Sequence, residues 1–247
     1  MPRVIAVLLF LLSNLIVSHA MAGAIGTVVA SSPSASATGP GGTRALSAGG
    51  QVFEHDKIAV TSGSAQIQLL DGTKLVVGAN SALVLEKFLM KGGSTAQNVS
   101  VDALRGTFRF ITGNSAKSAY NIQTANATIG IRGTGFDFWV AERTGVALLK
   151  GKVRLCSKSD RTSCINLEPN CSIGVAGDSN HARTLRSVEK TAVIAARLPY
   201  LANQDELRSQ FRLNTASCSH DLPREPSGGY QQPPQQQRGG CEGDCAG

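Results

Sequence analysis

Apolar and polar residues alternate through the middle of this chain. Residues 66–69 alternate cleanly, and further along Phe108 and Phe110 fall on one face of a run that places Thr107 and Arg109 on the other. A period of two is typical of a strand with one buried face. This pattern predicts strands whose aromatic side chains point into a core.

A second alternating stretch covers residues 136–140. Phe136, Phe138 and Val140 share one face, whereas Asp137 and Trp139 share the other. We expect this stretch to be a half-buried strand. The residues before it, 124–131, are small, polar and β-branched, which favours a strand as well.

Short segments of this kind recur between turn signals. Asp71 and Gly72 form a strong turn signal between strands predicted at 66–69 and 74–77, and Leu83 and Leu85 share a face of a strand predicted at 81–88. A first strand is expected at 26–30, a flexible loop at 31–43 and another loop at 91–97. The fold class is therefore all-β, with stacked short strands that form either a β-sandwich or a solenoid-like roll.

Glycines and an arginine separate the two halves of the stretch 124–140. Three glycines within six residues permit positive φ or a close backbone approach, and an arginine there can donate up to about five hydrogen bonds. One interpretation is a glycine-kinked strand junction, with Arg132 buried and paired with Asp137, so that Arg132→Ala would destabilise the fold. The other is a loop that grips a ligand. The motif comprises Gly130, Arg132, Gly133, Thr134 and Phe136.

The pattern changes after about residue 177. Residues 185–198 have helical composition and Pro199 ends that helix. Asn203 and Glu206 resemble a capping box that opens a short helix through Phe211. These helices either cover an open edge of the β domain or dock a partner. The predicted divisions are a signal peptide (1–22), a β domain (23–183), a helical extension (184–216) and a disordered Pro/Gln/Gly-rich tail (217–247).

The first residues predict export. One positive charge, an apolar run at 4–12 and small residues at Ser18, Ala20 and Ala22 match a secretory signal peptide cleaved after Ala20 or Ala22. The alternative is an uncleaved anchor, but the apolar run is shorter than the roughly 20 residues that a membrane-spanning helix needs. We expect a periplasmic or secreted protein.

Six cysteines in an exported chain suggest disulfides. Cys156 ends one predicted strand and Cys164 begins the next, so a hairpin would pair them. Cys241 and Cys245 could close a small ring in the tail, and the pairing of Cys171 and Cys218 stays open.

The formal net charge is +7, with basic residues scattered along the chain. Lys150, Lys152 and Arg154 fall on one face of an alternating segment. That face is either simply solvated or a strip for an acidic polymer. Nucleic acid is not an expected partner, because the chain is predicted to be exported.

No pattern of catalytic residues is recognisable. Asp71 is most simply a turn residue, and the histidines lack a second histidine at ligand spacing. We therefore expect a non-enzymatic protein with no cofactor and no metal site.

Several motifs in order resemble the FecR domain family. The segment 131–136 resembles the family's VRGT-x-F core, Asp71-Gly72-Thr73 its D-G-T turn, and Leu104 to Phe108 its L-x-G-x-F strand. The resemblance spans about residues 23–175. It implies an all-β sensor domain at the cell envelope that contacts an envelope protein, such as an outer-membrane transducer, in signalling. The cytoplasmic sigma-factor-binding segment and membrane helix of FecR-type regulators are not recognisable, so the resemblance is to a stand-alone exported sensor domain. The alternative is a module that binds polysaccharide or peptidoglycan through the basic face.

Overall fold

The computed structural model describes residues 23–177 and 181–222, so the predicted signal peptide and most of the predicted tail lie outside the described residues. Strands dominate, and short helices follow them. The strands are β1 Ala24–Ser31, β2 Ala35–Gly39, β3 Gly42–Ala45, β4 Gln51–Phe53, β5 Lys57–Val60, β6 Ala65–Leu69, β7 Lys74–Val77, β8 Ser81–Gly92, β9 Thr95–Ile111, β10 Tyr120–Thr124, β11 Ala127–Ile131, β12 Gly135–Val140, β13 Thr144–Lys150, β14 Val153–Ser157, β15 Cys164–Leu167, β16 Ile173–Ala176 and β17 Arg183–Thr184. The helical elements are η1 Lys117–Ala119, α2 Ser187–Arg197, α3 Pro199–Ala202, η2 Ser209–Phe211 and η3 Ala216–Asp221.

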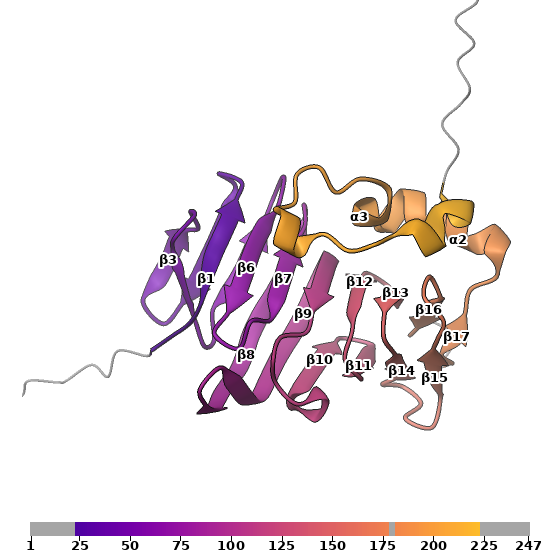
Figure 1. Ribbon diagram of the computed structural model, residues 1–247, viewed down its shortest axis with the longest axis horizontal. Helices are drawn as coiled ribbons and strands as arrows, with labels where there is room; N and C mark the ends of the chain where they lie inside the picture. Colours follow the sequence, from indigo (N-terminus) through magenta and orange to yellow (C-terminus); the bar gives the residue numbers. More distant parts are fainter. Residues whose placement is uncertain (1–22, 178–180, 223–247) are drawn as a thin grey trace, which may run out of the picture.

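The strands pack as two layers, which run one above the other in Figure 1. One layer, the covered sheet, has the order β4-β1-β6-β7-β9-β12-β13-β16-β17. The other, the open sheet, has the order β3-β2-β5-β8-β9-β10-β11-β14-β15. The chain passes repeatedly from one layer to the other, and the layers do not close into a barrel. The predicted all-β class is confirmed. The structure has features of both predicted architectures, because its two layers form a sandwich and the chain winds between them as in a flattened roll.

Strand β9 belongs to both layers. Residues 95–105 pair with β8 in the open sheet, whereas 106–111 pair with β12 in the covered sheet. Gly106 lies at the crossing with a φ of 100°, and a Cβ there would lie 2.4 Å from the Cα of Ser81. Only glycine combines this backbone with this close approach.

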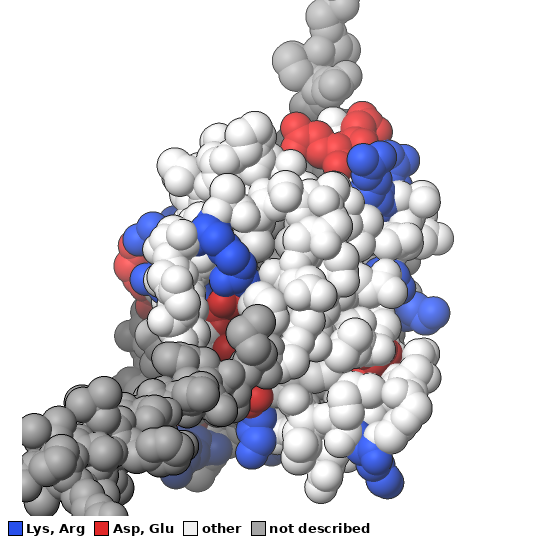
Figure 2. Space-filling model, turned by 90° about the vertical axis from the view of Figure 1, so that its left-hand side faces the viewer, with Lys and Arg blue, Asp and Glu red and all other residues white. Residues whose placement is uncertain are grey.

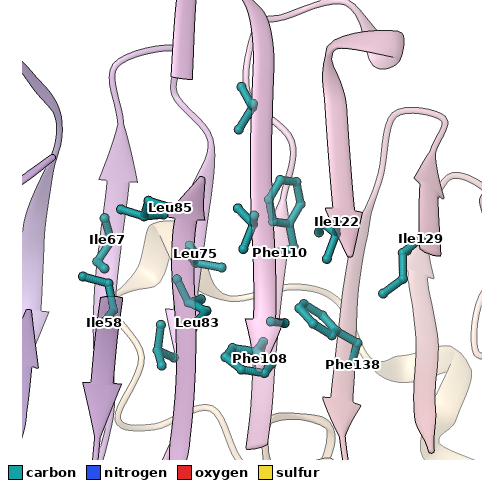
Figure 3. Close-up of a cluster of buried hydrophobic side chains, with 14 of the residues drawn as sticks. Ile58, Ile67, Leu75, Leu83, Leu85, Phe108, Phe110, Ile122, Ile129 and Phe138 are labelled. Carbon is teal, nitrogen blue, oxygen red and sulfur yellow. The ribbon is translucent and has the colours of Figure 1, made fainter. Parts of the chain in front are cut away.

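The core fills the space between the layers. The aromatic rings predicted to point inward are fully buried, with Phe108 stacked on Phe138 at 4.8 Å between centroids and Phe110 on Phe136 at 5.7 Å. Aliphatic side chains such as Leu83 come from the open sheet to meet them, as Figure 3 shows. Burial of these apolar side chains is the dominant stabilising term for the sandwich.

A C-terminal strap, residues 185–222, covers the outer face of the covered sheet (Figure 1). Ile194 of α2 and the nearby Leu198 pack with Trp139, Leu149 and other residues of that face. The predicted helix at 185–198 is confirmed as α2. The strap lies over a sheet face, so the expected covering of an edge is wrong.

The predicted capping box at Asn203 is also wrong. Asn203 Oδ1 does accept a hydrogen bond from the N–H of Asp205 at 2.7 Å, but the N–H of Asn203 donates to the carbonyl of Pro199, and residues 203–211 contain no helix except the short turn η2. The N–H of Leu207 donates to the carbonyl of Gln204, and the neighbouring groups bond to the sheet: Gln66 donates to the carbonyl of Glu206 and accepts from the N–H of Arg208. These bonds to the sheet replace those that a helix would make.

Two predicted loops are strands. Residues 31–43 contain β2 and half of β3, and Ala35 and Ala37 of β2 alternate inward and are buried in the core. Residues 91–97 extend the β8–β9 pairing, and the N–H of Ala96 donates to Ser115 Oγ. Residues 217–221, expected to belong to the disordered tail, lie in η3, and the tail from residue 223 lies outside the described residues.

Both disulfides within the described residues tie late elements together. Cys156 and Cys164 are direct cross-strand partners with Cα atoms 4.0 Å apart, as the hairpin argument predicts. Cys171 bonds to Cys218, which anchors the strap to the segment before β16. Cys241 and Cys245 lie outside the described residues.

Candidate functional site

The glycine-arginine segment is the junction at which the chain passes from β11 in the open sheet to β12 in the covered sheet. Gly133 has a φ of 72° and Gly151 a φ of 88°. A Cβ on Gly151 would lie 1.9 Å from the carbonyl oxygen of Gly133, so two crossings between the layers touch here. Thr134 fastens them, because its hydroxyl donates to the carbonyl of Lys150. The glycines therefore have a structural role.

Arg132 does not have the buried position expected of it. Its backbone N–H donates to the carbonyl of Lys152, but its side chain is exposed and pairs with no carboxylate among the described residues. The expected Arg132–Asp137 pair is wrong because Arg132 lies outside the strand, beyond the end of β11, at the junction between layers. Its guanidinium is available to a ligand.

Basic side chains gather around this junction. Arg132, Lys152 and Arg154 line one shallow hollow of about 120 Å³ together with Asn166 and Glu168. A neighbouring hollow of about 680 Å³ is bordered by Lys117, Arg132 and Lys152. We call Lys117, Arg132, Lys152 and Arg154 the basic rim. Glu168 neutralises part of it through an ion pair with Lys152 at 2.7 Å.

The rim overlaps the predicted basic face without matching it. Lys152 and Arg154 take part, but Lys150, at the exposed end of β13, lines neither hollow. Lys117 comes from η1, and nothing in its local sequence marks it. The end of the molecule with β3 and β1 is different: most of the surface visible there belongs to uncharged residues (Figure 2).

Arg109 and Asp137 form the buried ion pair that the sequence interpretation assigned to Arg132. They are cross-strand partners of β9 and β12 and have no exposed side-chain surface. The guanidinium donates to Asp137 through Nε at 2.6 Å and through Nη2 at 2.8 Å. Burial raises the pKa of Asp137 above its usual value, and the charge and hydrogen bonds of Arg109 oppose that rise.

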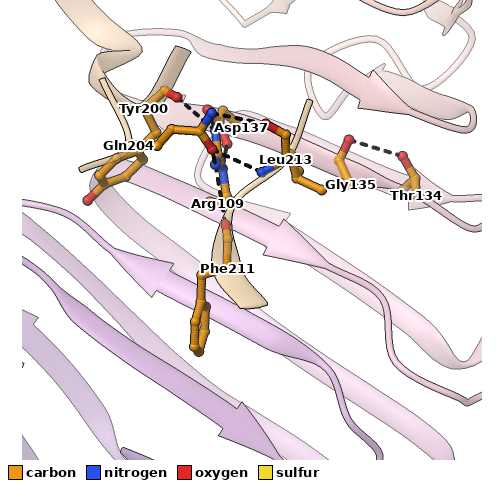
Figure 4. A network of polar contacts seen from close by, with 8 residues as sticks. All are labelled: Arg109, Thr134, Gly135, Asp137, Tyr200, Gln204, Phe211 and Leu213. Carbon is orange, nitrogen blue, oxygen red and sulfur yellow. Dashed lines mark hydrogen bonds and ion pairs between the residues drawn. The ribbon is translucent and has the colours of Figure 1, made fainter. Parts of the chain in front are cut away.

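The remaining donors of Arg109 hold the strap, as Figure 4 shows. They reach the carbonyls of Tyr200 at 3.0 Å and Phe211 at 3.3 Å and the side-chain carbonyl of Gln204. The sequence does contain a signal for this pair. Arg109 lies between two inward-pointing phenylalanines of its strand. Asp137 likewise lies between two inward-pointing phenylalanines of the neighbouring strand, so both charged side chains must point to the same outer face.

Asp71 is a turn residue, as predicted, and it is fully buried. Its carboxylate accepts from the backbone N–H and hydroxyl of Thr73, from Ser115 Oγ at 2.7 Å and from the hydroxyl of Tyr120 at 3.0 Å. Gly72, with a φ of 84°, follows it in the turn. Four donors on one carboxylate fix this turn and the segment before β10.

Within 23–177 and 181–222, no group of three or more His, Cys, Asp or Glu side chains converges as metal ligands do. No helix in these ranges is long and apolar enough to cross a bilayer.

The fold and the junction thus define a two-layered β protein with a strapped outer face. The FecR protein family matches residues 56–154, from just before β5 into β14, which is less than half of the chain. Within that segment the match confirms the resemblance carried by the DGT turn, the β9 motif and the glycine-arginine segment.

Two solved structures are similar at a low level. Both are crystal structures of a proposed anti-sigma factor from Parabacteroides distasonis ATCC 8503, one at 2.50 Å and one at 1.65 Å resolution. Identity is 18% for each, with TM-scores of 0.42 and 0.41 and coverage of 55% and 54% of this chain. The chain spans 63% of the length of each of those chains. No curated protein matches this chain.

Proposed function

We propose that this protein is a non-enzymatic, exported binding module of the cell envelope that contacts an envelope protein in signalling. The observation that carries the proposal is the FecR match over residues 56–154, which includes strands of both layers. The disulfides support an oxidising compartment outside the cytoplasm. Export itself rests on the amino-terminal sequence pattern.

The surface beside the glycine-arginine segment is the proposed contact. Arg132 is exposed there, and β15 is an edge strand that pairs only with β14 among the described strands. Edge strands can accept an extended segment of a partner through backbone hydrogen bonds. An outer-membrane transducer is the kind of partner that the FecR resemblance implies.

Capture from envelope extract tests this proposal. The full exported chain, tagged and with disulfides intact, should retain a specific protein that survives a high-salt wash. Arg132→Ala should reduce retention, whereas Arg197→Ala, the same charge change on the strap, should not. Recovery of the same proteins by both variants in equal amounts would count against the proposed surface.

A second candidate is binding of an acidic glycan. It is favoured by the convergence of Lys117, Arg132, Lys152 and Arg154 around two adjacent hollows. Such binding would weaken with salt, because exposed charges are screened over about 8 Å at physiological ionic strength. Salt-labile retention on an acidic polysaccharide, without a retained protein, would favour this candidate.

A further inference from the structure

The outer face of the open sheet carries a row of polar positions in register across several strands. Lys87 of β8 lies opposite Ser100 of β9, which lies opposite Asn121 of β10. The row continues through Gly130 and Arg154 to Asn166 of β15. We call these residues the polar row: Lys87, Ser100, Asn121, Gly130, Arg154 and Asn166.

Contacts along the row show that its members share one face. The amide of Asn121 reaches Ser100 Oγ at 3.5 Å, and a Cβ placed on Gly130 would lie 3.7 Å from the Cβ of Arg154. Gly130 therefore leaves a step in the row where a ligand can approach the backbone. The strap lies on the other side of the molecule, so this face stays open (Figure 1).

Each side of Gly130 has a hollow. The basic hollow with Arg154 and Asn166 lies on one side. On the other is a hollow of about 490 Å³ whose lining includes Lys87 and two carboxylates. The carboxylates are Glu86 and Asp102, and the other polar residues are Asn98, Ser100 and Gln123. Asn98 Oδ1 is shielded from solvent and accepts no hydrogen bond from any described residue.

The chemistry of the row fits a chain of sugars. Amide, hydroxyl and guanidinium groups are hydrogen-bonding partners for sugar hydroxyls, and arginine binds carboxylates with two parallel bonds. Neighbouring strands are about 4.8 Å apart, close to the length of one pyranose unit in an extended glycan. One strand can therefore present one polar group to each successive sugar.

We propose that the polar row is the binding site for a linear acidic polysaccharide, laid across the strands with a carboxylate at Arg154. Arg132 and Arg154 supply the charge complementarity at one end of the row, whereas Lys152 is paired with Glu168 and the hollow at the other end carries Glu86 and Asp102. The inference rests on the second candidate function and deepens it, because it moves the site from the basic rim onto the whole sheet face.

Titration with a labelled oligogalacturonate, as many units long as the row has strands, tests the proposal on the full exported chain at low salt. Arg154→Ala should weaken binding about tenfold, since it removes charge-assisted hydrogen bonds. Asn121→Ala, a neutral change at the centre of the row, should weaken it roughly threefold. A neutral cello-oligosaccharide of the same length should bind at least about tenfold more weakly.

One cationic variant serves as the control. Arg197→Ala, on the strap at the opposite side of the molecule, should change affinity less than about twofold, because Arg197 belongs neither to the row nor to the basic rim. All variants should retain the wild-type melting temperature, so that weaker binding reflects lost contacts.

Three outcomes would overturn the proposal. If the neutral oligosaccharide binds as tightly as the acidic one, the proposal that the ligand is acidic is wrong. If neither probe binds, the polar row is not a polysaccharide site. Loss of binding in Lys117→Ala, with Asn121→Ala unchanged, would refute the row but leave acidic-glycan binding at the rim. The capture experiment for a protein partner is independent of all three.

Discussion

Arg109 joins the covered sheet to the strap, because its guanidinium donates both to Asp137 of the sheet and to three residues of the strap. Replacing it with methionine removes one member of a buried ion pair and leaves Asp137 without its partner, which typically costs about 3–5 kcal/mol. Arg109→Met should lower the free energy of unfolding by that amount in urea denaturation. It should also shift the fluorescence of Trp139, the single tryptophan, to the red as the strap loosens.

A double variant provides the matched control. Arg109→Met with Asp137→Leu removes both charges, and well-packed apolar replacements of buried ion pairs are often close to neutral. The double variant should recover much of the lost stability. A cost below about 1 kcal/mol in Arg109→Met alone would show that the pair contributes little.

Arg132 should behave in the opposite way. Its side chain is exposed, and exposed substitutions usually change stability by no more than about 0.5 kcal/mol. Arg132→Ala should therefore leave the urea midpoint unchanged while it reduces partner retention. A large loss of stability would revive the buried role that the sequence suggested.

At the scale of elements, the first turn of α2 depends on Glu189. Its carboxylate accepts from Arg183 through two nitrogens and from the backbone N–H of Arg186, and these bonds lower its pKa to about 2. The folded-state pKa is thus below the unfolded value of 4.5. The resulting stabilisation is present above about pH 4.5 and is lost as the pH falls toward 2.

Glu189→Gln should remove the pH-dependent stabilisation that the ionised carboxylate provides. The difference in melting temperature between the wild type and this variant should be largest near neutral pH and should shrink steadily below pH 4.5. The difference in melting temperature between the wild type and Arg183→Ala, which removes the principal partner of Glu189, should shrink over the same pH range. A constant difference from neutral pH down to pH 2 would contradict the assignment.

Strand faces could be predicted from the sequence, whereas what covers them could not. Alternation placed Phe108, Phe110, Phe136 and Phe138 in the core, because a period of two fixes which side chains share a face. It could not show that Arg109 lies under a segment about 90 residues later, because that contact depends on tertiary packing.

The errors have a common physical origin. Arg132 is nearer than Arg109 to Asp137 in sequence, but the partner in a sheet is set by strand register and not by sequence distance. Residues 31–43 have the low β-propensity expected of a loop, yet Ala35 and Ala37 pack in the core, and packing outweighs propensity. The Cys171–Cys218 bond joins segments whose proximity only the strap creates.

At the scale of the whole molecule, the two disulfides should contribute unequally. The Cys171–Cys218 bond closes a sequence separation of 47 and the Cys156–Cys164 bond one of 8. Chain-entropy arguments assign about 4 kcal/mol to the longer ring and about 2.5 kcal/mol to the shorter. The paired variants Cys171→Ala/Cys218→Ala and Cys156→Ala/Cys164→Ala should differ accordingly in urea denaturation.

Only the longer ring anchors the strap. Its removal should make the strap a preferred site of limited proteolysis and expose Trp139 to a quencher. Removal of the hairpin disulfide should do neither. Equal quenching in both variants would show that the strap is held without Cys218.

Strand β9 has a mechanical consequence for the molecule. Ser100 faces the open side and Arg109 grips the strap, and one uninterrupted stretch of hydrogen-bonded backbone carries both. A displacement of β9 at the exposed face would therefore reach the contacts of Arg109 with the strap along the backbone of the strand, without passing through the apolar core. If the two faces are linked in this way, binding of a ligand at residues 98–102 should slow amide hydrogen exchange at residues 106–111.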